Sequence, residues 1–390
     1  MLKTMEERKT FSFSHQAMAT FFEVFVAGQD EAYARSAAHE FFREIDRLES
    51  FFSRFDERSE ISRINRLKPG EVLPVSLETY ECLKLSFEMM VETGGAFNVN
   101  FRALKKEFSK KETGIIKGED WKKNSKKQKR QLSQPGLEPS EIIKIGFRRE
   151  SDGSEKAREA GREKYKNRDE EQMTVTFGPG VPVNSSKQST VNLTSGAYAE
   201  NKKIGLKPYL KLFPLELVEQ PGGYGAVRLD IPDAVLDLDL GAVGKGYALE
   251  KAAGIFEAWE ITDFLVSAGG STVYARGAEP WPVAVGGGFD FFKPGKIYLK
   301  ERALSGSGHE VKGEHIFDPR KKCQRSRHLA AWVSHPSPAV ADALSTAFMV
   351  MSLEEIRKYA ESHPEVWALV LTRDKKSHRF KEGEFFEKGD

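Results

Sequence analysis

Two stretches that lie far apart in the chain carry residues suited to phosphate and metal chemistry. The first is a turn containing Gly241, Gly244 and Gly246, with Lys245 among them. Unpaired N–H groups at the start of a helix favour an anion, and a lysine adds positive charge. The turn is therefore suited to a phosphate. An ordinary strand-to-helix connection with a surface lysine fits equally well, because the turn is not a G-x-x-x-x-G-K-[ST] loop.

The second stretch is a helix expected to begin at Pro338, since Ser337 is a good N-cap and proline suits the first helical position. Helical spacing puts Asp342 and Thr346 one turn apart on the same face. A carboxylate and a hydroxyl are hard oxygen ligands of the kind that Mg²⁺ accepts. Many such pairs instead form a solvated face, or the threonine bonds to its own backbone. The otherwise apolar character of this helix favours the metal interpretation.

Hydrophobic periodicity predicts the elements that position these residues. Asp237 and Asp239 alternate with leucines, the period-two pattern of a half-buried strand over 235–240, and helical spacing follows from Tyr247. A short helix is expected after an N-cap at Ser59. The other expected elements are strands over 20–27, 264–275 with a bend at Gly269 and Gly270, 281–285, 296–299 and 329–334, and helices over 31–51 and 76–91.

Composition limits the possible classes of function. The 390 residues carry a net charge of +2, which argues against a general nucleic-acid or membrane-surface role. No apolar run is long enough to span a membrane, and the first residues lack the apolar region of a signal peptide. We therefore expect a soluble chain, cytoplasmic as given and periplasmic if an export signal was removed. The two cysteines form no metal-ligand spacing and no disulfide framework.

A polar segment within about residues 103–225 differs from the rest of the chain. It is rich in charge and poor in aromatic and β-branched residues, so much of it cannot bury enough surface to offset the entropy of ordering. Its basic run at 122–130 has the composition of a nucleic-acid-binding arm, but such runs are more often solvated. Residues 142–147, 174–177 and 209–217 are candidate framework elements within it.

Several motifs together resemble the ApbE family, the FAD:protein FMN transferases. In chain order they are Ala17–Thr20, Ser53–Phe55 with Ser59–Asn65, Gly95–Phe97, Asp239–Ala248, Ala268–Gly270, His315–Pro319 and Ala341–Thr346. The resemblance implies an α+β fold of mixed, mostly antiparallel sheets with packed helices, forming two lobes around a flavin cleft. It also implies a single domain over 1–390, interrupted by the polar, partly disordered insertion.

The activity implied by the resemblance is Mg²⁺-dependent transfer of FMN from FAD to a Thr or Ser of a target protein, with release of AMP. The expected acceptor is a redox subunit. Residues carried over to the FAD site are Met18, Phe55, Ala96, Phe97, Asn98, Asp239, Lys245 and Ile316. Those carried over to the metal are the backbone carbonyl of Ala242 and the side chains of Asp342 and Thr346.

Transfer needs a base for the acceptor's hydroxyl proton, and His315 is the candidate because its ordinary pKa lies near neutrality. Asp318 is placed to orient it, although a structural histidine bound to a loop is an alternative. The chain departs from the family pattern at Asn98, where the family usually has Asp, and at Phe55, where it usually has Tyr. Two other functions use the same residues: an FAD pyrophosphatase that gives FMN and AMP, and a non-catalytic FAD-binding protein.

Overall fold

A computed structural model describes residues 9–113, 143–145, 213–219, 225–229, 231, 234–286, 292, 295–308, 316–321, 323 and 326–381. Its main feature is an eight-stranded sheet in which every neighbouring pair is antiparallel. In spatial order the strands are β1 (Thr10–Ala17), β2 (Thr20–Ala27), β7 (Phe264–Ala268), β8 (Thr272–Arg276), β11 (Arg302–Gly308), β12 (His328–His335), β13 (Trp367–Thr372) and β14 (Ser377–Phe380).

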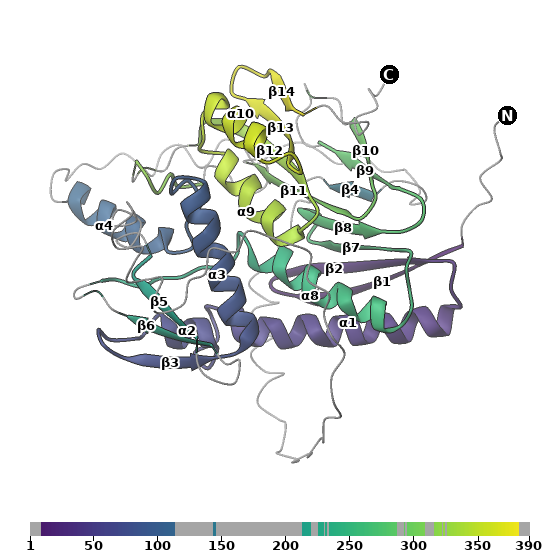
Figure 1. The fold of residues 1–390 in the computed structure, drawn as a ribbon, viewed down its shortest axis with the longest axis horizontal. Helices are drawn as coiled ribbons and strands as arrows, with labels where there is room; N and C mark the ends of the chain where they lie inside the picture. The colour runs from purple at the N-terminus through teal and green to yellow at the C-terminus, as the bar shows by residue number, and fades with distance from the viewer. Residues whose placement is uncertain are drawn as a thin grey trace, which may run out of the picture.

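Two smaller sheets accompany the large one. One contains β10 (Gly295–Leu299), β9 (Trp281–Val285) and β4 (Ile143–Ile145), and the other contains β3 (Val72–Val75), β6 (Gly225–Leu229) and β5 (Leu215–Glu219). The pairing of β4 with β9 is parallel, and the remaining pairs are antiparallel. Figure 1 shows the β3–β6–β5 sheet at the opposite end of the molecule from the long β1–β2 hairpin.

Helices provide the rest of the framework. They are α1 (Glu31–Phe52), α2 (Glu60–Ile64), α3 (Leu77–Glu92), α4 (Phe101–Thr113), α8 (Gly244–Ala258), α9 (Pro338–Phe348) and α10 (Leu353–Ser362). Their apolar faces and one face of the large sheet form the main core, and the other face of the sheet packs on β9 and β10 in a second core. No helix in the described part of the chain is long and apolar enough to cross a membrane.

The sequence-based expectations for most elements are confirmed. The α+β class with mostly antiparallel sheets is observed, and Ser59, Ser76 and Ser337 cap α2, α3 and α9 through their side chains. The bend expected at Gly269 and Gly270 joins β7 to β8, and both glycines have positive φ. The two-lobed flavin cleft stays a prediction.

The polar segment is only partly within the described residues. Its beginning forms α4, and 142–147 and 209–217 contribute β4 and β5, as expected for framework elements. The candidate at 174–177 and the basic run at 122–130 lie outside the described residues. Strands from both sides of the segment pair with each other, β3 with β6 and β2 with β7. This supports the single interrupted domain, which stays a prediction.

The strand predicted over 235–240 is wrong. This segment belongs to none of the sheets among the described residues. The side-chain amide of Asn65 bonds to both the N–H and the carbonyl of Leu238, at 2.7 and 3.1 Å. Asn100 bonds to the N–H of Asp237 at 2.9 Å and the carbonyl of Val235 at 3.2 Å. Two asparagines therefore bond to this backbone in place of a neighbouring strand.

Candidate active site

The N-terminal ends of α8 and α9 meet closely, which brings together the two stretches singled out in the sequence. A Cβ added at Gly246 would lie 2.2 Å from the carbonyl oxygen of Pro338 and 2.8 Å from Cα of Ala339. No real Cβ makes such a contact, so only glycine allows this approach. The helix begins at Gly244, before the predicted Tyr247, so Gly246 lies in the first turn of α8 and is required for helix packing. The packing places Asp342 beside the start of α8.

Asp342 belongs to α9, and its side chain lies against the N-terminal end of α8. The residue is 4% exposed. Its Oδ2 accepts a hydrogen bond from the N–H of Gly246 at 3.2 Å and lies 3.5 Å from Nζ of Lys245. Its Oδ1 lies 3.3 Å from each of the hydroxyls of Thr272 and Ser305. The sequence pattern suggested a phosphate at these amides. In the structure, the N–H of Gly246 at the start of α8 bonds to the carboxylate of Asp342, and phosphate binding at this turn stays a prediction.

Lys245 is the cation paired with this carboxylate. Its Nζ donates to the carbonyl of Gly241 at 2.5 Å and reaches Asp342 from the same position. The side chain is 21% exposed, whereas that of Asp342 is 6% exposed. Lys245 therefore connects the buried carboxylate to the accessible side of the turn, where an anionic ligand can reach the ammonium.

Asp239 lies just before the turn and is held from two sides. Its Oδ1 accepts from the N–H of Gly241 at 2.9 Å, and its Oδ2 lies 3.1 Å from Nε of Arg54. The Arg54 guanidinium also lies over the ring of Phe55, 4.1 Å from its centroid. Phe55 itself is 76% exposed. The exposed ring, the guanidinium and the carboxylate therefore form a layered set in which the outer aromatic face is open for stacking.

A further carboxylate, Asp237, is neutralised by α4. Its Oδ1 lies 3.3 Å from Nε of Arg102, and its Oδ2 lies 2.6 Å from Nζ of Lys106. Arg102 also approaches Oδ2 of Asp239, at 4.0 Å. Cations from α4 and from the loop after α1 thus balance the two carboxylates, which keeps this part of the site from repelling a phosphate.

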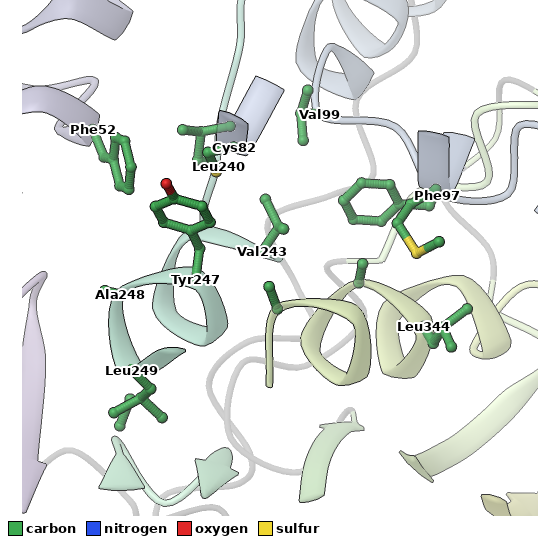
Figure 2. Close-up of a cluster of buried hydrophobic side chains, with 14 of the residues drawn as sticks. Phe52, Cys82, Phe97, Val99, Leu240, Val243, Tyr247, Ala248, Leu249 and Leu344 are labelled. Carbon is green, nitrogen blue, oxygen red and sulfur yellow. The ribbon is translucent and has the colours of Figure 1, made fainter. Parts of the chain in front are cut away.

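The segment of Ala96, Phe97 and Asn98 is buried beside residues 235–240. Asn98 accepts a hydrogen bond from the N–H of Asn100 at 2.6 Å, and Asn100 in turn holds Asp237. Phe97 is 1% exposed. Figure 2 shows its ring above α9. Phe97 therefore packs in the main core, in the same cluster as Val243 and Leu344.

Met18 and Ile316 lie at the edges of this assembly. Met18 forms the tip of the β1–β2 hairpin with Ala19, and both have positive φ, 49° and 58°. Positive φ at both central residues is what a two-residue type I′ hairpin loop requires, and here it joins Ala17 to Thr20. The hairpin adjoins the β7–β8 turn through a hydrogen bond from Gly269 to Phe21, at 2.8 Å. Ile316 is buried and packs in the main core.

The proposed base lies outside the described residues, because the structure describes the chain again only from Ile316. Asp318 is described and is 2% exposed. Its Oδ1 accepts from the backbone N–H and from Nε of Arg320, at 3.1 and 3.3 Å. Arg320 also binds Glu355 on α10, so this loop is anchored to the C-terminal part of the fold. The pairing of His315 with Asp318 stays a prediction.

Sequence reasoning missed several residues that contact the predicted ones. Arg54 lies within a motif that was recognised, yet its bond to Asp239 depends on tertiary structure. The hydroxyls around Asp342 and Thr346 were also missed. The sequence feature that could have indicated two of them is the spacing of Ser305 and Ser307, which puts both side chains on one face of a strand.

The donor set fits a hard divalent cation. Asp342 and Thr346 share one face of α9, as expected from their spacing, and they offer a carboxylate and a hydroxyl. The backbone carbonyl of Ala242 stays a predicted third ligand. Mg²⁺ is bound by such oxygens, completed by water and phosphate. The described residues include no cluster of three or more His, Cys, Asp or Glu side chains that could hold a metal. A site here would therefore rely on mixed oxygen donors.

Fold and site together define an α+β protein in which a carboxylate and a lysine meet at a glycine turn between two helices. The model of the ApbE family matches residues 18–178 and 215–370, and the chain belongs to this family. An FAD:protein FMN transferase of Klebsiella pneumoniae is 29% identical over 205 residues. That match spans 48% of this chain and 56% of the relative's length.

Solved structures show the same fold. The flavin transferase ApbE from Vibrio cholerae has a TM-score of 0.61 at 19% identity, covering 96% of this chain and 98% of its own. The ApbE protein from Thermotoga maritima has a TM-score of 0.60 at 22% identity, covering 96% and 97% respectively. At these identities the likeness establishes the α+β fold and its topology.

Proposed function

We propose that this chain is a Mg²⁺-dependent enzyme that transfers the FMN part of FAD to a Thr or Ser hydroxyl of an acceptor protein and releases AMP. The observation that carries the proposal is the buried carboxylate of Asp342. It is held against the start of α8 beside Lys245, in a member of a family whose curated relatives are named FAD:protein FMN transferases.

Asp342, Thr346 and the carbonyl of Ala242 would hold the metal. The ion supplies positive charge at the FAD pyrophosphate, which phosphoryl-type transfer requires in addition to positioning. Lys245 supplies a second positive charge from the same turn. In the structure it shares Oδ2 of Asp342 with the Gly246 amide, and a phosphate at the turn would draw its ammonium toward the more accessible side.

The flavin would bind on the side of Phe55. Its exposed ring offers a stacking surface, and Arg54 holds that ring next to Asp239. Phe55 provides stacking without the hydroxyl that tyrosine would add. Asn98 provides hydrogen bonds without the charge of an aspartate. These two positions therefore affect recognition of the flavin and leave the pyrophosphate part of the site unchanged.

In the transfer step, the oxygen of the acceptor hydroxyl forms a bond to the phosphorus of the FMN phosphate. The bond between that phosphorus and the bridging oxygen breaks, and AMP leaves with the bridging oxygen. The hydroxyl proton passes to His315, which Asp318 would orient. The acceptor would be a redox protein that carries a suitable Thr or Ser.

The test is an incubation of the full chain with FAD and Mg²⁺, with and without a purified redox subunit encoded beside its gene. The expected result is AMP release that depends on the acceptor and equals the covalent flavin formed on it. Equal AMP release without the acceptor would identify a pyrophosphatase instead. FAD binding without AMP in either reaction would identify a non-catalytic flavin-binding protein.

A further inference from the structure

A buried group of hydroxyls connects the two side chains of the proposed metal site. Thr272 on β8 and Ser305 on β11 are 0% exposed, and their hydroxyl oxygens are 3.0 Å apart. Each lies 3.3 Å from Oδ1 of Asp342. A hydroxyl carries one proton, so if one of the pair donates to the other, the second still donates to the carboxylate.

The chain of hydroxyls continues along α9. Ser345, also 0% exposed, lies 3.4 Å from Ser305 and 2.9 Å from Ser307, and it donates to the backbone carbonyl of Asp342 at 3.0 Å. The hydroxyl of Ser307 lies 3.2 Å from that of Thr346. A row of neighbouring hydroxyls therefore lies between the carboxylate of Asp342 and the hydroxyl of Thr346.

The sheet presents these hydroxyls to α9 for a structural reason. Ser305 and Ser307 alternate along β11 and share the face that packs on α9. Gly306 between them faces the other way, where a Cβ would lie 2.8 Å from the ring of Trp332. The same strand thus contributes to the second core on one face and meets the proposed metal ligands on the other.

We propose that Thr272, Ser305 and Ser307 are positioning residues for a divalent cation: the first two fix the carboxylate of Asp342, and Ser307 fixes the hydroxyl of Thr346. This inference rests on the proposed function, because it takes those two side chains to be the metal ligands. None of the three hydroxyls is assigned to contact the metal or FAD.

The physical reason is the geometry of the carboxylate. Oδ2 is held by the Gly246 amide and approached by Lys245, while Oδ1 is held only by the two hydroxyls among the described contacts. Removing those donors leaves Oδ1 unsatisfied in a buried place and frees the carboxylate to rotate toward Lys245. Loss of such an orienting partner typically lowers metal affinity by about 10- to 100-fold.

The experiment measures Mn²⁺ binding to the full chain by electron paramagnetic resonance, with Mn²⁺ as a probe for Mg²⁺ and without FAD. Ser305→Ala and Thr272→Val should each weaken Mn²⁺ binding by about 10-fold or more. Thr272→Ser keeps the hydroxyl and should bind Mn²⁺ as the parent chain does. Ser267→Ala is the matched control. This serine is 0% exposed on β7 of the same sheet, and its hydroxyl bonds to Glu23. Its removal should leave Mn²⁺ binding unchanged.

Ser307 is tested through its partner. Ser307→Ala should weaken Mn²⁺ binding in the parent chain and have no further effect when Thr346 is already changed to Val. Equal effects of Ser307→Ala in both backgrounds would overturn its assignment. Thermal unfolding without metal identifies any variant that fails to fold, and Ser307→Ala then carries the comparison, because Ser307 is only partly buried.

Asp342→Asn tests the metal site separately from the positioning role. If this variant binds Mn²⁺ as the parent does, the metal site itself is wrong and the inference falls with it. If it loses binding while Ser305→Ala and Thr272→Val stay within about twofold of the parent, only the positioning role is overturned. Loss of binding in all three variants, with Thr272→Ser and Ser267→Ala unaffected, supports both.

Discussion

His335 supports the start of α9, the helix that carries Asp342 and Thr346, and its protonation should destabilise the fold. Its Nδ1 accepts a hydrogen bond from the N–H of Ser337 at 2.9 Å, directly before Pro338. Burial lowers the pKa of His335 from 6.5 to about 4. The Ser337 carbonyl and Glu365 favour the protonated ring, while Arg302 and His363 oppose it, and burial outweighs them all.

The sign and size of the effect follow from this pKa. Because the folded state holds the ring neutral, the unfolded chain binds the proton more readily between pH 6.5 and about 4. Stability is therefore complete above pH 6.5 and falls as the pH drops toward 4. The whole difference corresponds to about 3 kcal/mol, of which about 2 kcal/mol is lost by pH 5.

The assay is urea unfolding at about pH 7.5 and about pH 5 of the parent chain and of His335→Asn. Asparagine keeps an oxygen that can accept from Ser337 and has no proton to gain. The parent should lose about 2 kcal/mol more than the variant between the two pH values. Equal losses in both proteins would refute the reasoning, because the carboxylates that titrate in this range are common to both.

Two further predictions concern α8 and the base. Gly246→Ala should lower the free energy of unfolding by about 2–3 kcal/mol, because its Cβ would collide with the carbonyl of Pro338. Gly254 lies in the same helix with open space around it, so Gly254→Ala should raise the free energy of unfolding by up to about 1 kcal/mol. Equal changes for the two variants in urea unfolding would contradict the role of Gly246 in packing. His315→Ala should slow flavin transfer by about 100-fold or more with FAD affinity unchanged. An unchanged rate, measured as covalent flavin formed over time, would mean that another group takes the proton.

The parts of the site that depend on local sequence could be predicted. The cap at Ser337, the start of α9 and the shared face of Asp342 and Thr346 all depend on residues within two turns of a helix. The same holds for the cap at Ser59. In each case the interacting groups are neighbours in the chain, so spacing alone determines their geometry.

The other parts depend on residues distant in the chain. Alternation of Asp and Leu over 235–240 predicted a strand and could not show that Asn65 and Asn100 would bond to this backbone in place of a partner strand. The carboxylate of Asp342 at the start of α8 required the close approach of two helices at Gly246. Likewise, Phe97 lies in a motif associated with the flavin, yet its ring is buried in the core.

The most direct test of the account is mass spectrometry of a purified redox-subunit acceptor after incubation with this chain, FAD and Mg²⁺. The expected result is an added mass equal to FMN esterified to one Thr or Ser. That addition should require Mg²⁺ and be absent with Asp342→Asn, whose folding is checked by circular dichroism. The same covalent addition with folded Asp342→Asn would contradict the assignment of the active site.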